Sequence, residues 1–87
     1  MAQYKLEVKA KAIKELEKLH PDIGMRLLQS IENLPFSPRT RQSHKLRGSS
    51  DSYRLRVGDY RVLYQIDEDS KVITVYKVGH RRDVYRE

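Results

Sequence analysis

The stretch that decides the fold is KLRGSSDSYRLRVGDYRVLYQI, residues 45–66. Its second half holds two runs of β-prone residues, 53–57 and 60–64, with only Gly58 and Asp59 between them. A Gly-Asp pair flanked by such runs is a strong signal for a hairpin with a two-residue turn. The sequence therefore predicts a β-hairpin, and the rest of the chain has to supply a layer that covers it.

This hairpin has two unlike faces, because side chains alternate between the faces of a strand. The turn predicts the cross-strand pairs Val57–Tyr60, Arg56–Arg61 and Leu55–Val62. One face then carries mostly apolar side chains, namely Tyr53, Leu55, Val57, Tyr60, Val62 and Tyr64. The other face, called the arginine face below, carries Arg54, Arg56, Arg61 and Leu63.

The arginine face contains an unfavourable pair. Arg56 lies directly opposite Arg61, and like charges in that position destabilise neighbouring strands. A rule broken without an evident local compensation points to function. We interpret the face as a surface for a polyanion, with a merely solvated basic strand as the alternative.

Composition places the chain in the class of small, charged domains. With 87 residues it fits one domain, residues 1–87, and a mean hydropathy of −0.79 allows only a thin core. It has no cysteine, so neither disulfides nor thiolate metal sites are expected. Neither a membrane span nor a signal-peptide core is seen, and a cytoplasmic location is the default expectation.

The positive charge is concentrated in one part of the chain. The formal net charge is +6, and residues 37–64 alone hold seven Lys or Arg against two Asp. Most of these cations are arginines, whose planar guanidinium binds phosphate in a bidentate manner. This distribution favours nucleic acid as the partner.

The remaining segments predict an α+β domain. The expected elements are a strand at 4–8, helices at 10–19 and 21–34, an irregular connection at 35–52, the hairpin at 53–64 and a last strand at 72–78. We expect a β-α-α-β-β-β order, with a small antiparallel sheet and the two helices packed as a hairpin on its apolar face. The arginine face is then left open, with the tail at 80–86 close to it.

Three motifs in the second half of the chain suggest a family. They are KLRG at 45–48, DSYRLRVGDYRVLYQ at 51–65 and VGHRRDVY at 78–85. In this order they resemble the RelE/ParE superfamily of bacterial and archaeal toxins, and most of all the RelE-type mRNA interferases. The resemblance implies a RelE-like fold and a metal-independent endonuclease, without a cofactor, that cuts the mRNA codon in the ribosomal A site.

The resemblance also assigns residues to this activity. In the family, attack of a 2′-hydroxyl on the adjacent phosphorus takes place on a face with basic residues on both hairpin strands, an arginine after the last strand and a tyrosine near the C-terminus. The matching catalytic positions here are Arg54, Arg56, Arg61, Arg81 and Tyr85. The expected RNA-binding positions are Lys45, Arg47 and Arg82.

The general base is a separate question. Well-known members carry lysines on the first hairpin strand, whereas Arg56 is an arginine, which stays protonated at physiological pH. Histidine titrates near neutrality, and our hypothesis is that His80 acts as base or acid. The alternative is that His80 is a capping or solvated residue. We interpret His20 and His44 as structural or incidental.

Three functions remain in competition at this point. The main one is a ribosome-dependent mRNA endonuclease toxin, whose implied partners are the ribosome, mRNA and a cognate antitoxin, with operator DNA as a partner of the toxin–antitoxin complex. The second is a ParE-like inhibitor of DNA gyrase without nuclease activity. The third is a non-catalytic RNA-binding module that uses the same basic face.

Overall fold

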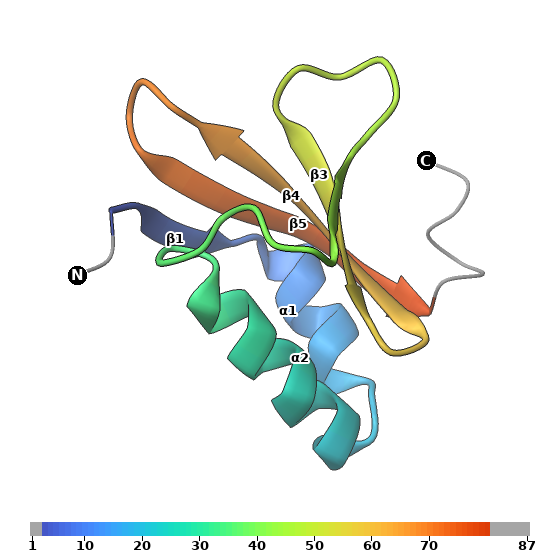
Figure 1. Cartoon of the computed structure of the whole chain (residues 1–87). Helices are drawn as coiled ribbons and strands as arrows, with labels where there is room; N and C mark the ends of the chain where they lie inside the picture. Colours follow the sequence, from blue (N-terminus) through green and yellow to red (C-terminus); the bar gives the residue numbers. More distant parts are fainter. Residues whose placement is uncertain (1–2, 81–87) are drawn as a thin grey trace.

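The computed structural model describes residues 3–80, which form two helices and one five-stranded sheet. In chain order the elements are β1 (Lys5–Val8), α1 (Ala10–Glu17), α2 (Pro21–Asn33), β2 (Ser43–Lys45), β3 (Ser52–Val57), β4 (Tyr60–Asp67) and β5 (Val72–His80). The strands lie side by side in the order β1-β5-β4-β3-β2. Both helices pack on one face of the sheet (Figure 1). The predicted α+β class is therefore confirmed.

The β3–β4 hairpin has the predicted register. Val57 lies opposite Tyr60, and Arg56 lies opposite Arg61. At the turn, Gly58 has a φ of 59°, a left-handed conformation that glycine adopts without the steric penalty of other residues. The turn chemistry thus fixes which side chains share a face.

The first difference from the prediction concerns β1. This strand pairs in parallel with β5, with Leu6 opposite Ile73, so the sheet is mixed rather than purely antiparallel. Parallel neighbours need a long crossover connection, and everything from α1 to β4 lies between these two strands. The hairpin signals at the end of the chain constrain β3, β4 and β5, but they do not determine where the strand before the helices attaches.

The second difference lies in the connection at 35–52, which was predicted to be irregular. Ser43, His44 and Lys45 form the edge strand β2, which pairs antiparallel with β3. A strand of three residues is too short to show the alternation by which strands are recognised. β2 adds an edge strand beside β3, the strand that carries Arg54 and Arg56.

The core lies between the helices and the apolar face of the sheet. Its buried members are Ala12, Leu27, Ile31, Leu34, Leu55, Val62, Tyr64, Ile66, Ile73, Val75 and Val78. Full burial of a large apolar side chain contributes about 1.5–3 kcal/mol. These contacts hold the hairpin with its apolar face inward, as predicted.

Both helices begin at the predicted residues, whereas α1 ends at Glu17 and α2 at Asn33, two residues and one residue before the predicted ends. At the start of α2 the His20 side chain caps the helix by accepting a hydrogen bond from the backbone N–H of Asp22 at 3.2 Å, and Pro21 occupies the first turn. His20 is thus structural, as expected. Neither helix in residues 3–80 has the length and apolar character of a membrane-spanning helix.

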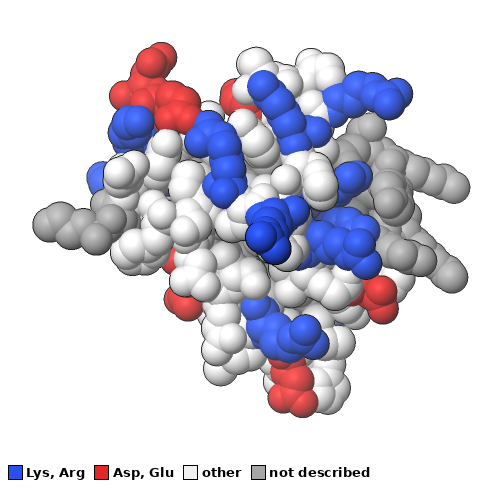
Figure 2. Space-filling view, viewed as in Figure 1, with Lys and Arg blue, Asp and Glu red and all other residues white. Residues whose placement is uncertain are grey.

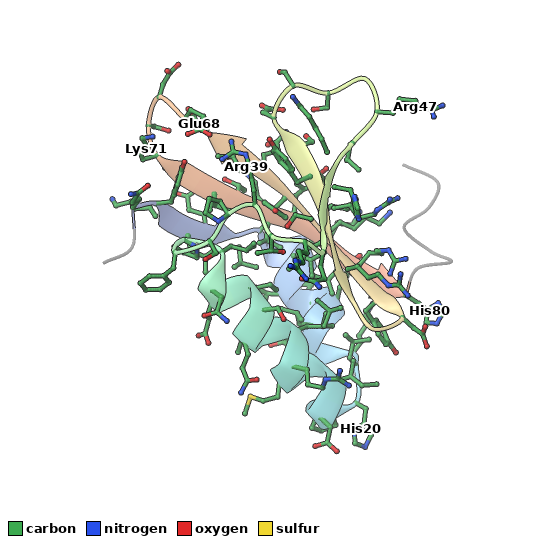
Figure 3. The ribbon with its side chains drawn as sticks, in the orientation of Figure 1. His20, Arg39, Arg47, Glu68, Lys71 and His80 are labelled. Carbon is green, nitrogen blue, oxygen red and sulfur yellow. The ribbon has the colours of Figure 1, made fainter. Side chains whose placement is uncertain are left out.

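Two tyrosines and an ion pair hold the connection between α2 and β2 against the sheet. The buried Tyr64 hydroxyl donates to the Pro38 carbonyl at 2.5 Å, and burial raises the pKa of this phenol. Arg39 forms an ion pair with Glu68 and donates to the Tyr53 hydroxyl at 3.1 Å. In Figure 3 Arg39, Glu68 and Lys71 lie close together at one end of the sheet.

The buried hydrogen bond of Tyr64 should contribute measurably to stability. Replacing Tyr64 by Phe leaves the Pro38 carbonyl without this donor, and we expect the free energy of unfolding to fall by about 1–2 kcal/mol. Tyr53→Phe is the matched control, because it removes only an exposed hydrogen bond from Arg39 and should cost less. Urea unfolding of both variants gives the comparison, and equal losses would contradict it.

The Glu68 ion pair should make stability depend on acidity. Hydrogen bonds from Arg39 and, to a smaller extent, Tyr4 lower the pKa of the Glu68 carboxyl from 4.5 to about 2. A lowered carboxyl pKa stabilises the folded state above pH 4.5, and this contribution is lost as the pH falls toward 2. Glu68→Gln should therefore be less stable than the unmodified protein at neutral pH and equally stable near pH 2. Urea unfolding at both pH values tests this, and a difference that persists in acid would refute it.

Candidate nucleic-acid interface

The arginine face lies on the side of the sheet that the helices leave uncovered. Arg54 stands opposite Leu63, and Arg61 stands between Arg56 on β3 and Gly79 on β5. The alternation that sends Leu55 and Val62 into the core sends these arginines to the other side. The structure thus brings together the three hairpin arginines predicted from the sequence.

The three arginines differ in exposure. Arg56 is exposed and Arg54 is half-buried, whereas Arg61 is only 5% exposed. The Arg61 guanidinium donates to the Tyr60 carbonyl at 3.1 Å, and Arg56 donates to the Gly58 carbonyl at 3.4 Å. The expectation of an open face is therefore wrong for Arg61 and for Leu63, which is 1% exposed. A charge with so little water around it interacts more strongly with a bound anion than an exposed one does.

A groove beside Arg54 gathers two further predicted cations, Lys45 and Arg47. Its volume is about 740 Å³, and it lies between the β2–β3 connection and β5. The lining residues are Lys45, Leu46, Arg47, Gly48, Ser49, Ser52, Arg54 and Tyr76. In Figure 3 Arg47 extends from this connection. The two RNA-binding positions expected before the hairpin thus share one groove with an expected catalytic arginine.

Tyr76 is the lining residue that the sequence did not reveal. In the pairing of β4 with β5, Leu63 lies opposite Lys77 but Tyr64 lies opposite Val75, so Tyr76 is an extra residue in a β-bulge. The run VITVYKV looks apolar on both sides, and nothing in it indicates a shift of register. No pattern of alternation could have assigned Tyr76 to a face.

The histidines lie differently from the prediction. His80 pairs with Tyr60, and their rings meet edge to face at 5.4 Å between centroids. Tyr60 belongs to the helix-covered face, so the described structure does not bring the His80 ring to the arginine face. His44, by contrast, is exposed and lies directly opposite Arg54 on β2. The pairing of β2 with β3 is what places His44 there, and the sequence did not predict β2.

The C-terminal predictions fall on residues that the structure does not describe. Arg81, Arg82 and Tyr85 lie outside the range 3–80. Within that range, no group of His, Asp or Glu side chains is arranged to hold a metal ion.

Charge is unevenly distributed over the surface. In Figure 2 basic side chains spread over the region of β2, β3 and the hairpin turn, while the largest acidic group lies at the turn between β4 and β5. Two of the acids in this turn have partners, because Glu68 pairs with Arg39 and Asp67 accepts hydrogen bonds from the backbone of Asp69 and Ser70, which lower its pKa. The acidic turn and the basic groove thus occupy different parts of the molecule.

Comparison with known proteins gives a consistent result. A family model described as the ParE toxin of the type II toxin–antitoxin system parDE matches residues 6–85. The mRNA interferase toxin RelE of Escherichia coli is 35% identical over 88 residues, which cover 97% of this chain and 92% of the relative. A putative toxin RelE1 of Methanocaldococcus jannaschii is 28% identical over 87 residues, 97% of each chain.

A solved structure extends the likeness to three dimensions. In the archaeal RelE–RelB complex from Pyrococcus horikoshii, the matching chain superposes with a TM-score of 0.80 at 32% identity, covering 91% of this chain and 96% of that one. The resemblance inferred from the three motifs is thereby confirmed. This chain belongs to the RelE/ParE superfamily of toxins of toxin–antitoxin systems.

Proposed function

We propose that this toxin is an endoribonuclease that cuts mRNA codons in the ribosomal A site and so inhibits translation. The observation that carries the proposal is the convergence of Arg54, Arg56 and Arg61 on one face, next to a basic groove. The relative named mRNA interferase toxin supports the same activity. Arg81 and Tyr85 are proposed to complete the site.

The chemistry explains why this face needs several cations. The 2′-oxygen forms a bond to the adjacent phosphorus while the bond to the 5′-oxygen of the next nucleotide breaks, which leaves a cyclic phosphate and a 5′-hydroxyl. The phosphorane between these states carries two negative charges, and fixed cations stabilise it. Arg61 is suited to this role, because its burial and its hydrogen bond to the Tyr60 carbonyl fix its position. A metal ion is not required by this scheme.

A proton must also leave the 2′-hydroxyl and reach the departing 5′-oxygen. The sequence suggested His80 for one of these transfers, but its ring lies against Tyr60 on the other face of the sheet. His44 lies on the arginine face, beside Arg54. The geometry therefore favours His44 over His80 as the group that transfers the proton.

The toxin is expected to act with partners. Solved structures of related toxins include complexes of RelE with RelB, which supports a cognate antitoxin for this chain. We propose that the antitoxin neutralises the nuclease, that the ribosome and mRNA are its targets in the cytoplasm, and that the toxin–antitoxin complex binds operator DNA.

Removal of Arg61 should abolish most of the cleavage. The purified protein is added to translating ribosomes with a defined mRNA, and the cuts are mapped relative to the reading frame. We expect cuts within the A-site codon, reduced by about 100- to 1000-fold in Arg61→Ala because one transition-state charge is lost. A similar loss is expected for Arg81→Ala. Arg26→Ala is the control, because Arg26 is an exposed cation on α2, and its rate should be unchanged.

One outcome would replace the proposal by the gyrase alternative. If the mRNA stays intact while the protein inhibits supercoiling by DNA gyrase, the nuclease proposal is wrong. Binding of RNA without any cut would instead indicate the non-catalytic module.

The two histidines can be separated by the dependence of the cleavage rate on pH. His44→Gln should flatten one limb of the profile, because it removes from the arginine face the imidazole proposed to transfer the proton. His80→Gln should leave the shape of the profile unchanged. Single-turnover cleavage across the pH range measures both, and the opposite result would return the proton transfer to His80.

A further inference from the structure

Apart from Arg54, the lining of the groove takes no part in the proposed bond-breaking step, yet the groove has the features of a ligand site. Its volume of about 740 Å³ lies within the range of roughly 300–1000 Å³ that is typical of small-ligand sites. Among the described residues that line it, three carry positive charge and none is acidic. The groove thus suits an anion that also has a sizeable uncharged part.

One wall of the groove is a turn held by its own hydrogen bonds. Leu46 and Ser52 are joined through their backbones at 2.9 Å, and the Ser49 hydroxyl oxygen accepts from the backbone N–H of Ser52 at 3.0 Å. Gly48 has a φ of 81°, which other residues rarely adopt. Asp51 accepts a hydrogen bond from the Ser49 hydroxyl at 3.1 Å, so its carboxylate is engaged within the turn. The wall is therefore formed before any ligand arrives, which lowers the cost of binding.

The opposite wall contains Tyr76, placed there by the bulge in β5. Without the extra residue, strict alternation from Val75 to Val78 could not keep both of these valines in the core. The bulge keeps both in the core and lets Tyr76 line the groove with Arg54. Bulges are frequent next to active sites, where they redirect a side chain. Tyr76 is half-buried, so part of this residue remains accessible to solvent.

From these features we propose that the groove is a nucleobase-binding subsite for single-stranded RNA, in which Tyr76 stacks on one base while Lys45, Arg47 and Arg54 hold the adjoining phosphates. The proposal rests on the proposed action on RNA. Proteins that bind single strands combine a basic groove along the backbone with aromatic rings for the bases. The subsite therefore holds a nucleotide next to the scissile phosphate at Arg54 and Arg61, and positions the strand for cleavage.

Two variants of Tyr76 and one RNA test the subsite. Tyr76→Leu removes the aromatic ring but keeps an apolar side chain, and Tyr76→Phe keeps the ring. The probe is a heptanucleotide with 2′-O-methyl riboses, which cannot be cut, and a series of the same RNA with one base removed at each position. Fluorescence anisotropy gives the dissociation constants, and thermal unfolding shows that both variants are folded.

We expect one abasic position to weaken binding to the unmodified protein by about 5- to 100-fold, the effect of losing one stacked base. Tyr76→Leu should bind the intact RNA more weakly by a similar factor and should be indifferent to that abasic position. Tyr76→Phe should behave like the unmodified protein. Together these results establish the stack between Tyr76 and one base.

Failure of the subsite can be told apart from failure of the proposed function. If Tyr76→Leu binds every RNA of the series as the unmodified protein does, the subsite is wrong, even when ribosomal cleavage proceeds as proposed. If the unmodified protein cuts no mRNA on ribosomes but shows the Tyr76-dependent abasic pattern, the subsite holds and the nuclease proposal falls. If Tyr76→Leu weakens only the binding of an acidic peptide and not of RNA, the groove is a protein-binding site and the inference is overturned.

Discussion

The register of the β3–β4 hairpin is the constraint on which the other features depend. A shift by one residue would exchange the two faces, placing Arg54, Arg56 and Arg61 against the helices and the core residues in solvent. The two-residue turn at Gly58 and Asp59 and the burial of Leu55 and Val62 favour the same register. Because local turn chemistry and core packing agree, the chain can maintain a cluster of like charges on the opposite face.

That cluster is unfavourable in the free protein and useful in a complex. Arg56 and Arg61 face each other across the hairpin, and in the proposed function a phosphate bound between them would weaken their repulsion. Their unequal exposure suggests different tasks. In the proposed function the buried Arg61 would interact strongly with a bound charge, whereas the exposed Arg56 would adjust to the RNA strand that approaches it. The core on the other face supplies the stability that this arrangement requires.

Much of the fold and part of the site could be predicted from the sequence. The hairpin register, the two helices and the gathering of the three arginines follow from alternation, turn residues and proline positions. The parallel pairing of β1 did not, because local patterns do not say which distant strand becomes a neighbour. β2 is too short for a pattern, and with it the placement of His44 opposite Arg54 was missed. The three motifs identified the superfamily without any of these details.

The bulge at Tyr76 shows how regular alternation can fail within a strand. Counting from Val78 back to Val75 assigns these two residues to opposite faces, yet both are in the core. The extra residue in β5 allows both Val75 and Val78 to face the core. It also leaves the aromatic residue Tyr76 in the lining of the basic groove. Alternation of apolar and polar residues shows which side chains of a regular strand face the core. A bulge inserts one residue and so shifts this alternation locally. A bulge can in this way redirect a side chain without loss of core packing, which explains why bulges are frequent next to active sites.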